Sequence, residues 1–344
     1  MAVTIKDVAK KAGVSPSTVS RVLSNHPRIS AETSRKVKEI MEQLGYHPNI
    51  MAKSLVSKTT NSICIMLPKS AEELFSNFFF MELIRGIVTQ ATRLGYDVLI
   101  SSGANEKEEV EAVSRLLNGR RVDGVILLYS RKDDPVIDFL QENGHHFVLI
   151  GRSEKYPDTL SVDNDNVQAC YDATKHLISL GHERIGFVSG PPDLIFSKDR
   201  LKGYMDALND AGLEMRPEWI VEGEFLQDSG YRAMSFFMNL PERPTAIVLI
   251  DDVISFGVLR SLHELKFRVP EDLSLVSFNN IPLSELSTPP LSSMDIGIYN
   301  LGYTASQLLI QSIESGNDKS YQKRQVIPHR LMIRESSMHS VSKK

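Results

Sequence analysis

The stretch TIKDVAKKAGVSPSTVSRVLSNHP, residues 4–27, decides how this chain begins to fold. The apolar residues of its first half recur at the spacing of one helix face: Ile5, Val8, Ala9 and Ala12. Gly13 is placed to end that helix, because glycine readily adopts the left-handed conformation. Ser15 can then cap a second helix whose first position is Pro16, where a missing N–H costs nothing. Two short helices joined by a tight turn are therefore expected.

A third helix follows in the same manner. Ser30 is its expected N-cap and Gly45 its expected end. Its apolar side is formed by Val37, Ile40, Met41 and Leu44. Three short helices, the first two separated by a tight turn, are typical of a helix-turn-helix unit.

The outer face of the second helix carries small hydroxyl side chains and one arginine: Ser17, Thr18, Ser20 and Arg21. Short side chains let a helix lie close to DNA in the major groove, where Ser and Thr reach phosphates or base edges. Arg21 has the planar fork that pairs with guanine through two hydrogen bonds. The alternative interpretation is an ordinary solvated helix in a small bundle.

The charge distribution favours the DNA interpretation. Residues 1–60 hold ten Lys and Arg against four Asp and Glu, a net charge of +6. The whole chain carries −4, so residues 61–344 carry −10. A basic amino-terminal part on an otherwise acidic protein is expected to bind a polyanion.

From residue 61 the pattern changes to alternating strands and helices. Apolar runs such as SICIML and VDGVILLY alternate with helical stretches, which predicts a parallel sheet covered by helices. The alternation starts again after TLSVDNDN, so two similar α/β lobes are expected, with a ligand in the cleft between them. The predicted organisation is a helix-turn-helix head, a hinge helix with its linker, and a two-lobed body of the periplasmic-binding-protein type. Its expected bounds are 1–48 for the head, 49–60 for the hinge, 61–340 for the body, 61–162 plus 292–324 for lobe one, and 163–291 plus 325–340 for lobe two.

Other classes of protein leave signatures that this sequence lacks. The first residues are charged and amphipathic, and no apolar run approaches the roughly 18 residues of a membrane span, so a cytoplasmic protein is expected. Cys64 and Cys170 stand in apolar surroundings and are expected to be buried free thiols. No metal-binding, phosphate-loop or nucleophile motif occurs, so neither a cofactor nor catalysis is expected.

Several segments together resemble the lactose-repressor and galactose-repressor family of bacterial transcription regulators. They are TIKDVAKKAGVSPSTVSRVLS, LGYHPNIMAKSL, ELIRGI, HLISLGHERIGFVSG, RLKGY and VPEDLSLVSF. The likeness runs from residue 2 to about residue 336, and within the family the chain looks most like regulators of maltose utilisation. The resemblance implies a homodimer on a near-palindromic operator and a sugar-type effector, such as maltose or a related glucoside, between the lobes.

The resemblance also implies which residues contact DNA. Ser17, Thr18 and Arg21 match base-reading positions, and Leu55 matches a leucine that a hinge helix pushes into the minor groove. The full expected set is Thr4, Ser15, Ser17, Thr18, Ser20, Arg21, Asn25, His26, Tyr46, Asn49, Ala52, Lys53 and Leu55. The segment 49–55 reads either as a plain linker or as a helix too short to be stable alone, which folds only when DNA and a partner chain support it.

In the cleft the resemblance implies six effector-binding residues: Phe79, Phe80, Arg200, Phe225, Asp251 and Asn279. Aromatic faces combined with Arg, Asp and Asn suit a neutral ligand rich in hydroxyl groups. Gly151 stands where other members often carry an acid, and the open space there favours a ligand larger than a monosaccharide.

Three alternatives are weighed against a sugar-released repressor. One is a regulator whose ligand, or a phosphocarrier protein partner, tightens DNA binding. The second is a secreted sugar-binding receptor, which would carry a signal sequence and no basic helical head. The third is a sugar-processing enzyme, for which Asp163, Asp251 and Asp252 are the candidate acids without a partner motif.

Overall fold

The computed structural model describes most of the chain, namely residues 3–23, 26, 28–46, 59–67, 77–128, 130–315 and 323–338. The chain divides into two compact units, residues 1–60 and residues 61–344. The predicted hinge helix lies outside the described residues, as do five of the expected DNA contacts: Asn25, Asn49, Ala52, Lys53 and Leu55.

The first unit contains the three predicted helices, α1 (Ile5–Ala12), α2 (Pro16–Leu23) and α3 (Ala31–Leu44). Gly13 and Gly45 follow α1 and α3 in the left-handed conformation, with φ of 69° and 62°. The Ser15 hydroxyl accepts from the Thr18 N–H at 3.1 Å and so caps α2. Side chains from all three helices form one small core: Val8, Ala9, Ala12, Val19, Val22, Val37 and Ile40. Local capping signals and this core together explain the helix-turn-helix arrangement.

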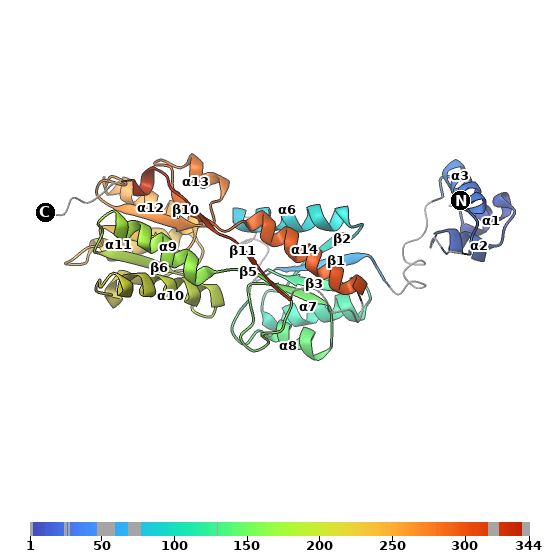
Figure 1. Cartoon of the computed structure of the whole chain (residues 1–344), viewed down its shortest axis with the longest axis horizontal. Helices are drawn as coiled ribbons and strands as arrows, with labels where there is room; N and C mark the ends of the chain where they lie inside the picture. Colours follow the sequence, from blue (N-terminus) through green and yellow to red (C-terminus); the bar gives the residue numbers. More distant parts are fainter. Residues whose placement is uncertain are drawn as a thin grey trace. The chain divides into compact units, whose positions relative to one another are not determined.

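The second unit is built on two six-stranded sheets (Figure 1). The first sheet has the order β11-β5-β4-β3-β1-β2, and all its pairs are parallel. Its strands are β1 (Ser62–Leu67), β2 (Asp97–Ser102), β3 (Gly124–Leu127), β4 (Phe147–Ile150), β5 (Ser161–Asn164) and β11 (Arg324–Ile327). The second sheet has the order β12-β10-β9-β8-β6-β7, in which only the β10–β12 pair is antiparallel. Its strands are β6 (Ile185–Ser189), β7 (Ile220–Glu222), β8 (Ala246–Leu249), β9 (Ser274–Phe278), β10 (Ser292–Asp295) and β12 (Arg330–Met332).

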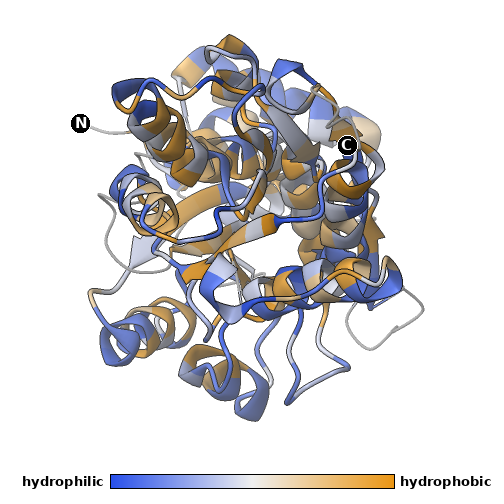
Figure 2. Ribbon diagram, turned by 90° about the vertical axis from the view of Figure 1, so that its left-hand side faces the viewer, coloured by the Kyte–Doolittle hydropathy of each residue, from blue (hydrophilic) through white to orange (hydrophobic). Residues whose placement is uncertain are grey.

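Helices cover these sheets, and hydrophobic residues concentrate in the strands and on the inner helix faces (Figure 2). Lobe one contains α6 (Phe78–Arg93), α7 (Glu106–Asn118), α8 (Pro135–Glu142) and α14 (Ile298–Ser315). Lobe two contains α9 (Asn166–Ser179), α10 (Ile195–Asp210), α11 (Gln227–Met238), α12 (Asp252–Glu264), α13 (Pro282–Leu286) and the short 3₁₀ turns η1 (Pro217–Trp219) and η2 (Glu335–Ser337). In Figure 1, α14 lies beside α6 although more than 200 residues separate them along the chain. Gly302 permits this contact, because a side chain there would collide with the Leu83 carbonyl oxygen.

The sheets assign three segments differently from the expected lobe boundaries. Residues 163–164 were expected in lobe two but belong to β5 of the first sheet, paired with β11. Residues 292–295 were expected in lobe one but form β10 of the second sheet, paired with β9. Residues 325–327 were expected in lobe two but belong to β11 of the first sheet, paired with β5. All three segments are short extended runs at a crossing between lobes, so their sequence pattern carries no information about which sheet they join.

The chain crosses between the lobes three times, and one side chain ties the crossings together. The crossings follow β5, β10 and β11 (Figure 1). The buried amide of Asn164 donates to the carbonyl oxygen of Ile296 at 2.8 Å and to that of Ile327 at 2.9 Å. Asn164 therefore fixes the spacing of the three connecting strands.

Among the described residues, no helix combines the length and apolar character needed to cross a membrane. Cys64 and Cys170 are free and fully buried, as predicted, and burial raises the pKa of each thiol to about 12.

Candidate DNA-binding surface and ligand cavity

The candidate DNA-binding surface is the solvent-facing side of α2. Ser17 and Arg21 are exposed there, one helical turn apart, while Thr18 and Ser20 are half-buried. The hydroxyl of Ser15 lies 2.7 Å from that of Ser17 and 2.8 Å from that of Thr18. These hydroxyls thus sit at the start of α2, where the backbone N–H groups favour a phosphate. The arrangement can place Arg21 at base edges while the hydroxyls contact the DNA backbone.

The other described head residues of the expected set have local structural partners. Thr4 forms a capping box with Asp7, whose carboxylate accepts from the Thr4 N–H at 2.9 Å and from its hydroxyl at 2.7 Å. These bonds lower the pKa of Asp7 below its ordinary value. The His26 ring accepts from the Arg28 N–H at 3.2 Å, and Tyr46 packs against the head core. Each of these residues therefore helps to hold the head together, and DNA contact by them stays a prediction.

The candidate ligand site is a cavity of about 410 Å³ between the two lobes of the second unit. All six expected effector residues line it: Phe79, Phe80, Arg200, Phe225, Asp251 and Asn279. Its lobe-one side adds Asn77, Leu128, Arg131, Ile150, Gly151, Asp163, Asn164, Ile296 and Leu301. Its lobe-two side adds Asn166, Pro191, Asp193, Leu194, Phe196, Glu224 and Leu226. The cavity lies at the carboxyl ends of several parallel strands, the usual place for a ligand in such folds.

Aromatic rings form part of both walls. Phe79 and Phe80 lie in the first turn of α6, which Asn77 caps by accepting from the Phe79 N–H at 2.9 Å. Their rings meet edge to face, with centroids 5.2 Å apart. On lobe two, Phe225 stacks on Phe196 with ring centroids 5.7 Å apart. The site therefore offers apolar rings from two directions, with polar groups between them.

Arg200 is held rigidly in the lobe-two wall. Its Nε donates to the Asn166 side-chain oxygen at 3.0 Å, and its Nη1 donates to the Ile250 carbonyl oxygen at 2.6 Å. The guanidinium carbon lies 4.3 Å from the centroid of the Phe278 ring. Burial lowers the pKa of Arg200 to about 10, so the side chain remains charged at neutral pH. These two donors thus help to order the wall.

Asp251 and Asn279 form a buried pair on the floor of the cavity. Asp251 accepts from the Val253 N–H at 2.7 Å, which caps α12, and from the Asn279 amide at 2.7 Å. Burial, and then the neighbouring Asp252, raise the pKa of Asp251 to about 7. The side-chain oxygen of Asn279 is buried and has no hydrogen-bond partner within the protein. A ligand hydroxyl is the kind of donor that this oxygen lacks.

Asp163 and Asp252 differ in their surroundings, although both were considered as catalytic acids. Asp163 Oδ2 is buried at the cavity without a hydrogen bond, 3.6 Å from the Arg324 guanidinium. Asp252 instead accepts from Ser284, Ser293 and the Ile281 N–H at 2.7 to 2.9 Å. Asp252 is thus occupied by the protein itself, while Asp163 is available to a ligand donor.

Two further sequence interpretations are refined by the geometry. Gly151 lines the cavity with φ of 103°, and a Cβ there would lie 2.9 Å from the Ser130 hydroxyl. Backbone conformation therefore requires glycine at this position, in addition to the space it leaves. Trp219 packs outside the cavity and donates to the Glu242 carbonyl oxygen at 3.0 Å. Phe196, Asn166 and Asp193 also line the cavity but were not predicted from the sequence. Nothing in their local sequence distinguishes them from ordinary helix and loop residues.

Comparison with known proteins identifies both units. Residues 4–49 match the family described as bacterial regulatory proteins, lacI family, and residues 174–337 match a periplasmic binding protein-like domain. The chain is 38% identical over 335 residues to the transcriptional regulator MalR of Streptococcus pneumoniae, covering 96% of this chain and 99% of that protein. It is 36% identical over 340 residues to catabolite control protein A of Priestia megaterium, covering 98% and 100%.

Solved structures agree with this relationship over the whole chain. A lac repressor dimer bound to operator and an anti-inducer superposes with a TM-score of 0.85 at 26% identity, covering 98% of this chain and 99% of that one. A complex of the transcriptional regulator CelR with cellobiose superposes with a TM-score of 0.75 at 31% identity, covering 97% and 99%. The helix-turn-helix head, the two-lobed body and these full-length matches show that the chain is a DNA-binding transcriptional regulator and belongs to the lacI family.

Proposed function

We propose that this regulator represses genes for sugar utilisation and is released from its operator by a neutral sugar, maltose or a related glucoside, bound between the lobes. The observation that carries the proposal is the cavity, which combines aromatic rings on two walls with buried oxygen atoms that lack donors. Sugars present C–H faces that suit aromatic rings, and hydroxyl groups that suit unpartnered acceptors.

The charges around the cavity support an uncharged ligand. Four carboxylates line it, namely Asp163, Asp193, Glu224 and Asp251, together with two arginines, Arg131 and Arg200. Arg200 already donates to Asn166 and Ile250, and Arg131 is ion-paired with Glu109 and Asp134. A phosphorylated sugar would thus meet an excess of negative charge in a setting where water screens it poorly.

The relatives support the sugar class. MalR proteins of Streptococcus pneumoniae and Staphylococcus xylosus share 38% and 34% of their residues with this chain. The CelR structure was solved as a complex with cellobiose, a neutral disaccharide. A cavity of about 410 Å³ falls in the usual range for small-molecule sites.

We further propose that the protein acts as a homodimer on a near-palindromic operator. Exposed apolar side chains lie on α6 and on the neighbouring edge strand β2: Met81, Val88 and Ile100, which are 38%, 39% and 47% exposed. An edge strand and helix that present apolar groups to solvent are suited to pairing with a second copy. Two heads would then read two half-sites related by the dimer axis.

Effector binding would reach the DNA through the hinge segment 49–60. In this scheme, the hinge segments of the two chains pair only when the first lobes of the two chains are held at a fixed distance from each other. Leu55 of each chain then enters the minor groove. A sugar that changes the lobe arrangement alters that spacing and weakens operator binding, by about 1–3 kcal/mol as is common for coupled sites.

The test is operator binding by the full-length protein, followed by fluorescence anisotropy during titration with maltose, cellobiose and maltose 6′-phosphate. The neutral sugar should weaken binding about 5- to 150-fold, and the phosphorylated sugar should have no effect. Arg200→Ala should remove the sugar response but leave operator binding intact, because Arg200 lies in the second unit. Arg216→Ala is the matched control, since Arg216 makes ion pairs with Glu214 and Glu242 away from the cavity.

Other outcomes would contradict particular parts of the proposal. A sugar that tightens operator binding would make the protein a co-repressor-type regulator. An Arg200→Ala variant with normal sensitivity would remove Arg200 from the site. Operator binding that no sugar affects would contradict the effector class and leave the DNA-binding function in place.

A further inference from the structure

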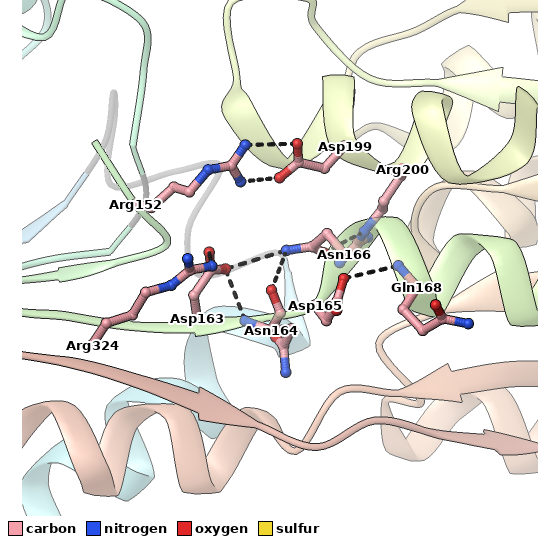
Figure 3. A network of polar contacts seen from close by, with 9 residues as sticks. All are labelled: Arg152, Asp163, Asn164, Asp165, Asn166, Gln168, Asp199, Arg200 and Arg324. Carbon is pink, nitrogen blue, oxygen red and sulfur yellow. Dashed lines mark hydrogen bonds and ion pairs between the residues drawn. The ribbon is translucent and has the colours of Figure 1, made fainter. Parts of the chain in front are cut away.

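An ion pair joins the two lobes beside the cavity. Arg152 follows β4 of lobe one, and Asp199 lies on α10 of lobe two. The guanidinium of Arg152 donates to both carboxylate oxygens of Asp199, with Nη2 2.8 Å from Oδ1. Figure 3 shows the two side chains facing each other through this pair of bonds. A two-bond arginine–carboxylate contact is the most geometrically demanding form of ion pair.

The position of this pair couples it to the ligand site. Arg152 directly follows Gly151, and Asp199 directly precedes Arg200; both neighbours line the cavity. The side chains are 29% and 11% exposed, so the pair is partly shielded from solvent. The contact can form only when the two cavity walls stand at one separation, because the partners belong to different lobes.

Neighbouring contacts reinforce the same closure. The loop after β3 meets the loop before α10, with the Lys132 N–H donating to the Asp193 carbonyl oxygen at 2.9 Å. On the inner side of the pair, Asn166 links Asp163 to Arg200, through bonds of 3.3 Å and 3.0 Å (Figure 3). Backbone contacts on the rim and this inner network also hold the lobes. The Arg152–Asp199 pair differs from the inner network because its two charges can be exchanged without changing a residue that lines the cavity.

We propose that Arg152 and Asp199 are positioning residues for effector binding, which latch the lobes over the cavity and set how long a ligand stays bound. The inference rests on the proposed function for the identity of the effector, but not for the latch itself. Opening the cleft requires the pair to break, so the pair slows ligand release.

The first experiment measures closure without any sugar. Spin labels on Lys107→Cys of α7 and Arg232→Cys of α11 report the distance between the lobes, because both positions are exposed and the native Cys64 and Cys170 are buried. Arg152→Ala should broaden the distance distribution towards longer values. The double variant Arg152→Asp with Asp199→Arg, which restores the pair in reverse, should return it to the original distribution. An unchanged distribution in Arg152→Ala would overturn the proposal.

The second experiment measures maltose binding by stopped flow and equilibrium titration on the same full-length proteins. Arg152→Ala and Asp199→Ala should each raise the dissociation rate about tenfold. In the charge-reversed double variant, the dissociation rate should return most of the way to that of the unaltered protein. Lys155→Ala is the matched control, because Lys155 pairs with Asp138 at 2.8 Å inside lobe one.

Two results would count against the latch here. If the dissociation rate rose equally in the single variants and in the reversed double variant, side-chain shape, and not the ion pair, would be responsible for ligand retention. A single-variant dissociation rate equal to that of the original protein would remove the pair from ligand retention. Failure of the unaltered protein to bind maltose would contradict the proposed effector, while the distance measurement would still decide the latch.

Discussion

Replacing Asn164 by alanine tests whether one amide holds the crossings between the lobes together. The side chain is buried and donates to the carbonyl oxygens of Ile296 and Ile327, at 2.8 Å and 2.9 Å. A neutral hydrogen bond contributes about 0.5–1.5 kcal/mol net, and a buried carbonyl left without a donor costs about 1–3 kcal/mol. Two such bonds are lost in Asn164→Ala, and partial access of water relieves some of the penalty. The free energy of unfolding of the second unit should therefore fall by about 2–4 kcal/mol.

The assay is urea unfolding followed by the fluorescence of Trp219, the single tryptophan of the chain, which is buried in lobe two. The midpoint should fall while the denaturant slope stays unchanged. Asn143→Ala is the control, since the exposed Asn143 amide makes one bond to the Phe139 carbonyl at 2.8 Å, and its loss should stay within about 0.5 kcal/mol. If Asn164→Ala lowered the free energy of unfolding by no more than the control does, the reasoning would be refuted.

Charge at the same position provides an independent check. Asn164→Asp would place an acceptor against two carbonyl oxygens, and only its protonated form could donate, to one of them. The variant should therefore lose more stability than Asn164→Ala at pH 8 and recover part of it at pH 5. A pH-independent loss would show that the side-chain donor is not what the two carbonyls require.

The remaining predictions concern the DNA surface and a buried acid. Arg21→Ala should weaken operator binding by about 1–3 kcal/mol and relax base preference, whereas Lys38→Ala should mainly reduce the salt dependence, as binding to operator variants at several salt concentrations would show. An unchanged ranking of operator variants in Arg21→Ala would disprove its base-reading role. Because the pKa of Asp251 rises from 3.8 to about 7 on folding, the folded protein keeps a proton that the unfolded chain releases, and stability should fall between about pH 4 and pH 7. Asp251→Asn should remove this part of the decline, which unfolding at pH 5 and pH 8 would measure; an identical pH dependence would contradict the assignment.

Much of the architecture followed from short-range sequence signals. The helices of the head were predictable because capping residues, Gly13, Gly45 and the apolar spacing all act within a few residues of one another. The two α/β series were predictable because a buried parallel strand must be apolar and its crossover must be helical. The six cavity residues were found by resemblance to a family, since their local patterns equally fit an ordinary core.

Long-range contacts decided the rest. The sequence alone determined a helix-turn-helix head, two parallel α/β lobes and a basic amino-terminal part, because each depends on periodicity or composition along the chain. Only the tertiary structure decided which sheet receives β10 and β11, that Asn164 reaches Ile296 from 132 residues away, and that Arg152 meets Asp199 from 47 residues away. Such contacts depend on how the lobes are packed against each other. A pairing between two polar side chains produces no periodic pattern in the sequence. The physical reason is that periodicity reports burial against a neighbour, whereas the identity of that neighbour is set by the fold as a whole.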